Sequence, residues 1–87
     1  MSSLSDAIAK KIKQKRKELG VKQWELGLLL GCSVQSIQHY EKGTCQMPLE
    51  MLNDLASLCC VPIDWFFLMH DEMLVFYYPL NEDGAAS

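Results

Sequence analysis

The sequence predicts an all-α fold, in which one small domain of five helices precedes a short C-terminal extension. Three observations support this prediction. Gly31 and Gly43 each follow a segment of helical length, and a glycine can end a helix because left-handed backbone costs it little. Apolar residues recur at helical spacing from Leu49 to Cys59. Pro62 then opens a further apolar segment, as suits the first turn of a helix.

The first helix is expected to begin at Asp6, with Ser5 as its N-cap. Basic side chains cover most of its surface, and we interpret them mainly as an ordinary solvated face. The expected inner face is apolar: Ala7, Ile8, Ile12 and Leu19. Pro48 is expected as the first residue of the fourth helix, whose inner stripe is Leu49, Leu52, Leu55, Ala56 and Cys59.

Two short helices, residues 23–30 and 34–42, are predicted on either side of Gly31. Ser33 is the expected N-cap of the second of them, because its hydroxyl can accept a free backbone N–H. Lys22 holds the same position before the first, where Ser, Thr or Asn is preferred, and should weaken that start. Two helices across such a turn form a helix-turn-helix unit, whose second helix enters the DNA major groove.

Residues 8–67 resemble the Cro/repressor-type helix-turn-helix family (xenobiotic-response-element type), and most of all the DNA-binding domains of lambdoid phage repressors. The resemblance implies a lambda-repressor-like five-helix domain, and the absence of paired carboxylates or a nucleophile–base arrangement predicts that the chain is not an enzyme. Gly27 departs from the pattern, since the family usually has Ala there. A helical Gly costs about 0.5–1 kcal/mol relative to Ala, so this helix should be softened but not lost. The residues that carry the resemblance are Gln23, Leu26, Gly31, Ser33, Ile37 and Glu41-Lys42-Gly43, flanked by IKQKRKELGVKQ and VPIDWFF.

The resemblance also implies the roles of individual residues. In lambdoid repressors an Arg of the first helix pairs with a Glu at the end of the second helix of the helix-turn-helix unit. This second helix, here residues 34–42, is the reading helix, and Arg16 and Glu41 match both positions. Spacing alone would place Val34 on the core side, whereas the resemblance places it at the first base-reading position. The expected base contacts are Val34, Gln35, Gln38 and His39. The expected phosphate contacts are Lys22, Gln23, Arg16, Lys42 and Thr44.

The C-terminal part carries more apolar residues than a chain of 87 residues can bury against itself. We expect a DNA-binding domain over residues 1–69 and an extension over 70–87, which ends in an acidic, disordered segment. Leu74 to Tyr78 could form a strand or continue the fifth helix. In this family the fifth helix often forms the dimer contact, and the expected interface is Phe66, Phe67, Leu74, Phe76 and Tyr78.

Charge is divided unevenly along the chain, whose net charge is −3. Residues 1–43 hold all eight Lys and Arg, whereas residues 44–87 hold none and seven of the eleven acids. A basic half suits phosphates, and an acidic half should face away from them. No apolar run approaches the roughly 20 residues of a membrane span, and we expect a cytoplasmic protein.

The four cysteines lack the spacing of a zinc site. We interpret Cys32 and Cys59 as small buried hydrophobes, although the adjacent Cys59 and Cys60 could also form a vicinal disulfide or bind a metal. Neither a catalytic arrangement nor a phosphate loop is visible, so the sequence predicts no cofactor, metal or small-molecule ligand.

The predicted function is sequence-specific regulation of transcription, most simply repression, by a homodimer on a palindromic operator. The alternative is an antitoxin or adaptor that uses the same fold to bind a protein. Trp24 leaves both open, because its ring could pack along a DNA backbone or partner, or could lie over the first helix. The sequence specifies neither the operator nor an effector.

Overall fold

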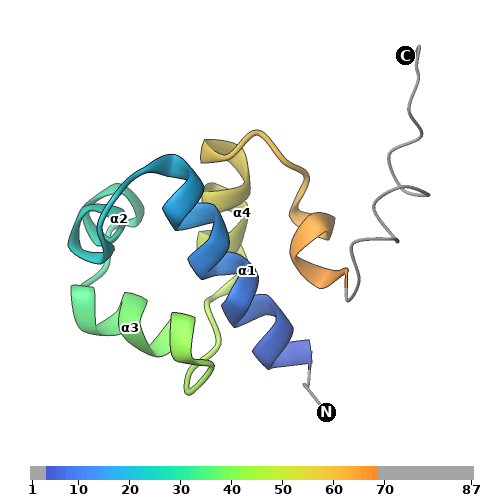
Figure 1. The fold of residues 1–87 in the computed structure, drawn as a ribbon, viewed down its shortest axis with the longest axis horizontal. Coiled ribbons are helices and arrows are strands. Elements are labelled where there is room, and N and C mark those ends of the chain that lie inside the picture. The colour runs from blue at the N-terminus through green and yellow to red at the C-terminus, as the bar shows by residue number, and fades with distance from the viewer. Residues whose placement is uncertain (1–3, 69–87) are drawn as a thin grey trace.

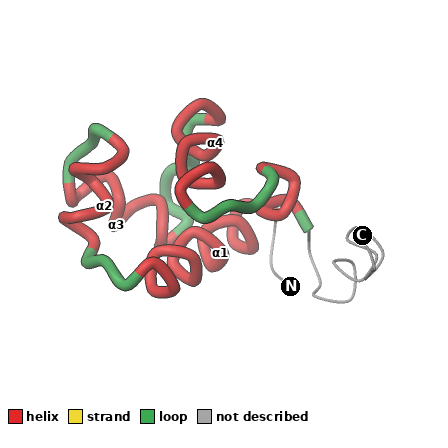
Figure 2. The backbone as a smooth tube through the Cα atoms, turned by 90° about the horizontal axis from the view of Figure 1, so that it is seen from above, coloured by secondary structure: helices red, strands yellow, loops and turns green. Residues whose placement is uncertain are grey.

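The computed structural model describes residues 4–68 and confirms an all-α fold for them. Four α-helices, α1 (Leu4–Leu19), α2 (Gln23–Leu30), α3 (Val34–Lys42) and α4 (Leu49–Leu58), precede one 3-10 helix, η1 (Ile63–Phe67). Helix α1 crosses the middle of the domain, with α2 and α3 packed together on one side and η1 on the other (Figure 1). Seen from above, α4 lies across from α1 (Figure 2), and its buried residues Leu52, Leu55 and Ala56 belong to the core.

The core forms where the inner faces of all five elements meet. Leu26, Ile37, Leu55 and Phe66 are fully buried, one from each of α2, α3, α4 and η1. The rings of Trp65 and Phe66 meet edge to face, with their centroids 5.1 Å apart, an arrangement that adds to the gain from burial. The remaining buried apolar residues are Ile8, Ala9, Ile12, Met47, Leu52, Ala56 and Trp65.

Several predicted details of α1 and α4 are wrong. Ser5 lies inside the first turn of α1 rather than capping it, because the helix already includes Leu4. Pro48 is the N-cap of α4 and not its first helical residue. Leu49, predicted on the inner stripe, is 65% exposed because it lies at the rim of the first turn. Met47, in the preceding loop, is buried in its place.

The predicted fifth helix is a single turn of 3-10 helix. Its five residues bury Trp65 and Phe66 and leave Phe67 36% exposed. No strand occurs within residues 4–68. The proposed strand from Leu74 to Tyr78, and the domain boundary after residue 69, lie outside the described residues. None of the helices in the described part is both long and apolar enough to cross a membrane.

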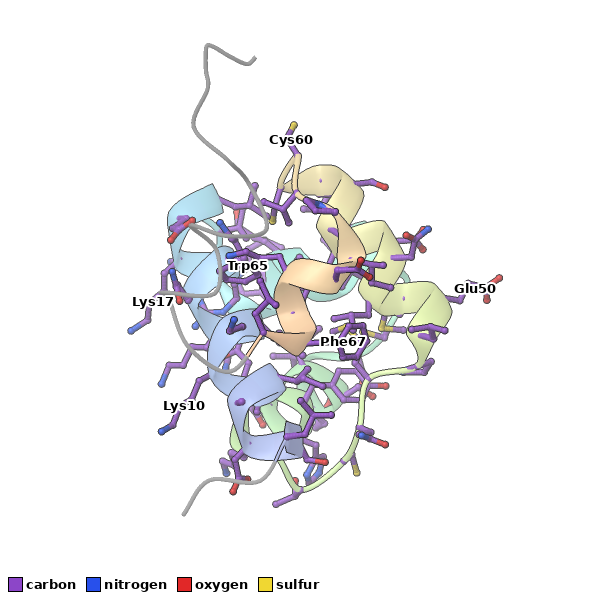
Figure 3. All side chains as sticks on the ribbon, turned by 90° about the vertical axis from the view of Figure 1, so that its right-hand side faces the viewer. Lys10, Lys17, Glu50, Cys60, Trp65 and Phe67 are labelled. Atoms are coloured by element: carbon purple, nitrogen blue, oxygen red, sulfur yellow. The ribbon has the colours of Figure 1, made fainter. Side chains whose placement is uncertain are left out.

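The basic surface of α1 is not uniformly solvated. The Nζ atoms of Lys11 and Lys15 lie 4.6 and 4.4 Å from the centre of the Trp65 ring, and Lys11 Nζ also donates to the Trp65 carbonyl at 3.0 Å. Ammonium groups are attracted to the face of an indole, so these two lysines help to fasten η1 to α1. By contrast, Lys10 and Lys17 point away from the domain (Figure 3).

Candidate nucleic-acid interface

The turn between α2 and α3 has the predicted geometry. Gly31 ends α2 in a left-handed conformation with φ of 78°, and Ser33 stands in extended backbone before α3. The Ser33 hydroxyl accepts the backbone N–H of Ser36 at 3.1 Å, which satisfies one of the free amides at the start of a helix. Gly43 ends α3 with φ of 83°. Both boundaries of the reading helix are therefore fixed by local chemistry.

Gly27 allows the turn to fold closely over α2. Its carbonyl accepts the N–H of Cys32 at 2.8 Å, and a Cβ added at Gly27 would lie 2.6 Å from the Cys32 carbonyl oxygen. Helix α2 is continuous through this position, as predicted. Close packing of the turn therefore explains why a residue without a side chain occupies this position. The helix propensity of glycine alone does not indicate this.

Helix α3 separates an inner from an outer face. Ile37 is fully buried and Tyr40 packs against the core, whereas Gln35, Gln38 and His39 are exposed. This arrangement agrees with the predicted outward direction of those three side chains. Val34, the residue with two conflicting interpretations, is half-buried at the first helical position. The exposed face offers two amides and one imidazole, which are groups that can hydrogen-bond to base edges.

An ion pair joins the end of α3 to α1. Two nitrogens of Arg16, Nε and Nη2, donate to the Glu41 carboxylate at 2.6 and 3.2 Å, so the predicted pairing is present in the structure. Gln23 at the start of α2 also donates to this carboxylate, at 3.0 Å. Gln23 and Arg16 had been predicted to contact phosphate, and here both orient the reading helix through Glu41.

A backbone hydrogen bond compensates for the missing side-chain cap at Lys22, and it was not predicted from the sequence. The Lys22 side chain is exposed and cannot accept a hydrogen bond, but its backbone N–H donates to the Glu25 carboxylate at 2.7 Å. A Glu three residues after the N-cap is half of a capping box, and this spacing was readable in the sequence. Lys22, Lys42 and Thr44 are all exposed at the ends of α2 and α3.

Thr44 makes contacts that the prediction of a phosphate-binding residue did not include. Its hydroxyl oxygen lies 2.9 Å from Nδ1 of His39 and 3.3 Å from the His39 carbonyl oxygen. The loop residue therefore restrains an exposed side chain of the reading helix. A hydroxyl five residues after a histidine gives no recognisable signal in the sequence, because the left-handed turn at Gly43 brings the two together.

Three apolar side chains of α2 are exposed, among them Leu29 at 56%. Trp24 is 53% exposed and Leu28, one turn later, is 73% exposed. Trp24 is thus about half exposed, which leaves both interpretations of its ring open.

The predicted dimer residues divide into two groups. Phe66 is fully buried in the core of its own chain, so its assignment to the interface is wrong. Phe67 is partly exposed, on the side of η1 that faces α4 (Figure 3). Leu74, Phe76 and Tyr78 lie outside the described residues.

The four cysteines differ in how far they are buried. Cys32 and Cys59 pack against the core, and burial raises the pKa of both thiols. Cys45 and Cys60 are exposed, and all four are free. Within residues 4–68, no group of three or more His, Cys, Asp or Glu side chains is placed to hold a metal ion.

Residues 12–66 match the helix-turn-helix family, and this match covers more than half of the chain. The chain belongs to the helix-turn-helix family. This membership confirms the resemblance inferred from residues 8–67. The curated relatives that the chain matches are named as transcriptional regulators.

Curated relatives in the helix-turn-helix family come from several bacteria. The chain is 37% identical over 60 residues to uncharacterised HTH-type transcriptional regulators of Sinorhizobium medicae and Rhizobium meliloti. It is equally similar to an uncharacterised transcriptional regulator in the ATPase CF(0) region of Rhodospirillum rubrum. Each match takes in 69% of this chain but 43% of the first two relatives and 56% of the third. The chain thus spans about half the length of the relatives it matches.

Two solved structures share the helix-turn-helix fold. The P22 c2 repressor, crystallised with synthetic operator 9T, aligns with a TM-score of 0.65 and 24% identity, over 72% of this chain and 96% of that one. A hypothetical transcription factor from Neisseria, NHTF, aligns with a TM-score of 0.73 and 20% identity, over 85% of each chain. At these identities the comparison establishes a shared fold, in agreement with the lambda-repressor-like architecture predicted from the sequence.

Proposed function

We propose that this domain regulates transcription by binding a specific DNA site with the exposed face of α3 in the major groove. The observation that carries the proposal is the outer face of α3, where Gln35, Gln38 and His39 are exposed while Ile37 is fully buried. A helix fixed in this way can present amides to base edges in a single orientation, and a glutamine can bond to adenine N6 and N7 together.

The ends of α2 and α3 provide the contacts to the DNA backbone. Lys22 and Lys42 are exposed and positively charged, and a phosphate near either one gains a favourable charge interaction. Gln23, at the start of α2, supplies a further N–H donor, while Arg16 is held against Glu41 and acts by fixing the frame behind these contacts. Val34, half-buried at the first turn of α3, is the residue proposed to touch a thymine methyl group.

The proposed regulator acts as a homodimer on a palindromic operator and represses transcription. A hollow of about 350 Å³ supports this proposal; Phe67 and Leu49 line it, and both are exposed on its rim. The chain continues from this point into residues 69–87, which include six successive apolar residues from Met73 to Tyr78. A second copy of the chain is the occupant that would cover this apolar rim, and twofold symmetry is the commonest closed arrangement.

Selection of bound sequences from random double-stranded DNA tests the proposed function. The wild-type chain should enrich a single motif with two symmetric half-sites. The Gln35→Ala variant should bind that motif more weakly by roughly 1–3 kcal/mol, with a much smaller change on random DNA. Gln14→Ala is the matched control, since it removes the same amide from α1, where it bonds to Glu18. Equal losses on both kinds of DNA would show that Gln35 does not read bases.

A second function, binding to a protein as an adaptor or antitoxin, is favoured by one observation. Trp24 and Leu28 expose an apolar strip on α2 that the fold does not use, and strips of this kind often mark contact with another protein. If the selection enriches no motif, this function replaces DNA binding. Replacing both residues with Ser should then abolish capture of the partner without lowering stability.

A further inference from the structure

His39 is held by a residue from outside its helix. Nδ1 of the imidazole lies 2.9 Å from the hydroxyl oxygen of Thr44, in the loop that follows α3. His39 is otherwise exposed on the proposed reading face. The contact therefore leaves Nε2 as the ring nitrogen that is free to meet DNA, and the tautomer decides whether this nitrogen donates or accepts a hydrogen bond.

The surrounding backbone determines where the Thr44 hydroxyl hydrogen goes. The Thr44 hydroxyl is also in hydrogen-bonding geometry to donate to the His39 carbonyl oxygen, 3.3 Å away, so this oxygen and Nδ1 compete for its one hydrogen. That oxygen already receives the N–H groups of Gly43, Thr44 and Cys45, at 3.0, 3.2 and 3.5 Å. A carbonyl has two lone pairs, so a fourth donor finds little left to bond. Nδ1, the shorter and less crowded contact, is therefore the better acceptor for this hydrogen.

We propose that Thr44 holds His39 in the tautomer with hydrogen on Nε2, so that His39 is a hydrogen-bond donor that reads guanine. This inference rests on the proposed function, because it assumes that α3 lies in the major groove. Guanine presents two acceptors there, N7 and O6, whereas adenine and thymine each present one acceptor, beside a donor and a methyl group respectively, and cytosine offers only a donor. Thr44 is then a positioning residue that acts through His39, in place of the phosphate contact predicted for it.

Nitrogen-15 NMR of the free full-length protein tests the tautomer without any DNA. At a pH where the imidazole is neutral, a histidine-labelled sample distinguishes a ring nitrogen that carries hydrogen from one that does not. The variant His70→Gln leaves His39 as the single histidine and removes any doubt of assignment. Hydrogen on Nε2 is the expected result. Hydrogen on Nδ1 would overturn the inference, since Nε2 would then be an acceptor.

Binding measurements on the selected DNA site test the reading of guanine. The base pair that His39 contacts is the one whose preference disappears in His39→Ala. At that pair the wild-type chain should prefer guanine over the other three bases by roughly three- to tenfold, as expected for one hydrogen bond. Thr44→Val keeps the shape of the side chain but removes the hydroxyl, and should reduce the preference to less than about twofold. Thr44→Ser should restore it.

The outcomes separate the inference from the proposed function. A preference for adenine, cytosine or thymine at the His39 position overturns the inference while DNA binding stands. Equal weakening of all sequences by Thr44→Val also overturns it, because that is the behaviour of a phosphate contact. If no DNA motif is selected, the proposed function fails, and the reading of guanine fails with it. The NMR result still decides whether Thr44 fixes the tautomer.

Discussion

Arg16 and Glu41 form a nearly buried ion pair, with 11% of the Arg16 side chain and 3% of the Glu41 side chain exposed. The third guanidinium nitrogen, Nη1, donates to the Val21 carbonyl at 3.0 Å. A buried charge is tolerated when its partner and its hydrogen bonds are all present. The pair therefore joins α1, the turn before α2 and the end of α3 into one rigid frame behind the reading face.

Removing either partner should strongly destabilise the domain. We expect Glu41→Ala or Arg16→Ala to lower the free energy of unfolding by about 3–5 kcal/mol, because each leaves an unpaired buried charge. The double variant should lose less than the sum of the two, with a coupling of roughly 0.5–3 kcal/mol. Urea denaturation of the four proteins gives these values.

The pair Lys15–Glu18, at 2.9 Å and with 52% of the Glu18 side chain exposed, supplies the control for this cycle. Hydrogen bonds from Lys15 and Gln14 lower the pKa of Glu18, but solvent screens the interaction. Glu18→Ala should therefore change stability far less than Glu41→Ala. Strictly additive effects of Arg16→Ala and Glu41→Ala would mean that the two side chains do not meet in solution.

The helix-turn-helix could be predicted closely because its boundaries depend on single residues with strong local preferences. Gly31, Ser33 and Gly43 fix both ends of α3 through left-handed backbone and one cap, and these effects act within a few residues. The burial of Ile37 and the exposure of Gln35 then follow from helical spacing. The Arg16–Glu41 pair spans 25 positions, and it was predictable through the resemblance to lambdoid repressors alone.

The features that escaped prediction depend on contacts between distant segments. Lys11 and Lys15 look like ordinary solvated lysines until η1 places Trp65 beneath them. Leu49 fits a helical stripe, yet it is exposed because its turn projects beyond the core. The sequence also did not reveal that the fifth helix is a 3-10 helix of five residues, since apolar content indicates burial but does not distinguish a short 3-10 helix from an α-helix.

The close packing at Gly27 predicts that a larger residue there is harmful. Gly27→Val should lower the free energy of unfolding by about 1–3 kcal/mol, because side-chain atoms would be forced against the Cys32 carbonyl. The matched control is Leu28→Val, at the neighbouring position of α2, which is 73% exposed. That change should cost no more than the roughly 0.7 kcal/mol range of helix propensity. Thermal or urea unfolding of both variants measures the difference, and similar losses would argue against the tight turn.

The four thiols should differ in their rates of alkylation. The thiolate is the reactive form of a cysteine. Burial raises the pKa of Cys32 and Cys59, so at a given pH a smaller fraction of these two thiols is ionised than of an ordinary cysteine. Cys60, by contrast, points away from the domain (Figure 3), and Cys45 is also exposed. At mildly alkaline pH, iodoacetamide should modify Cys45 and Cys60 first, and a higher pH should speed the other two.

Mass spectrometry with fragmentation between Cys59 and Cys60 resolves the adjacent pair. Unfolding the protein in denaturant provides the control, because the four rates should converge once burial is lost. Equal rates for Cys59 and Cys60 in the folded protein would contradict the predicted protection. Failure of both to react before a reductant is added would instead reveal a vicinal disulfide.

The last prediction concerns the proposed homodimer. Twofold symmetry would set two reading helices about 34 Å apart, the spacing of successive major grooves. The loop at residues 44–47 carries no charge, so one domain alone has few phosphate contacts and needs a second copy for tight binding.

Truncation after Met69 tests this arrangement and retains every buried core residue from Ile8 to Phe66. The full-length chain should sediment as a dimer at micromolar concentration, and the truncated chain as a monomer. On a two-half-site operator the truncated chain should bind on the order of a hundredfold more weakly, because avidity is lost. Binding to an isolated half-site is the control and should change little, since it needs one reading helix. A full-length chain that stays monomeric at tens of micromolar, yet still protects both half-sites, would refute the proposed dimer.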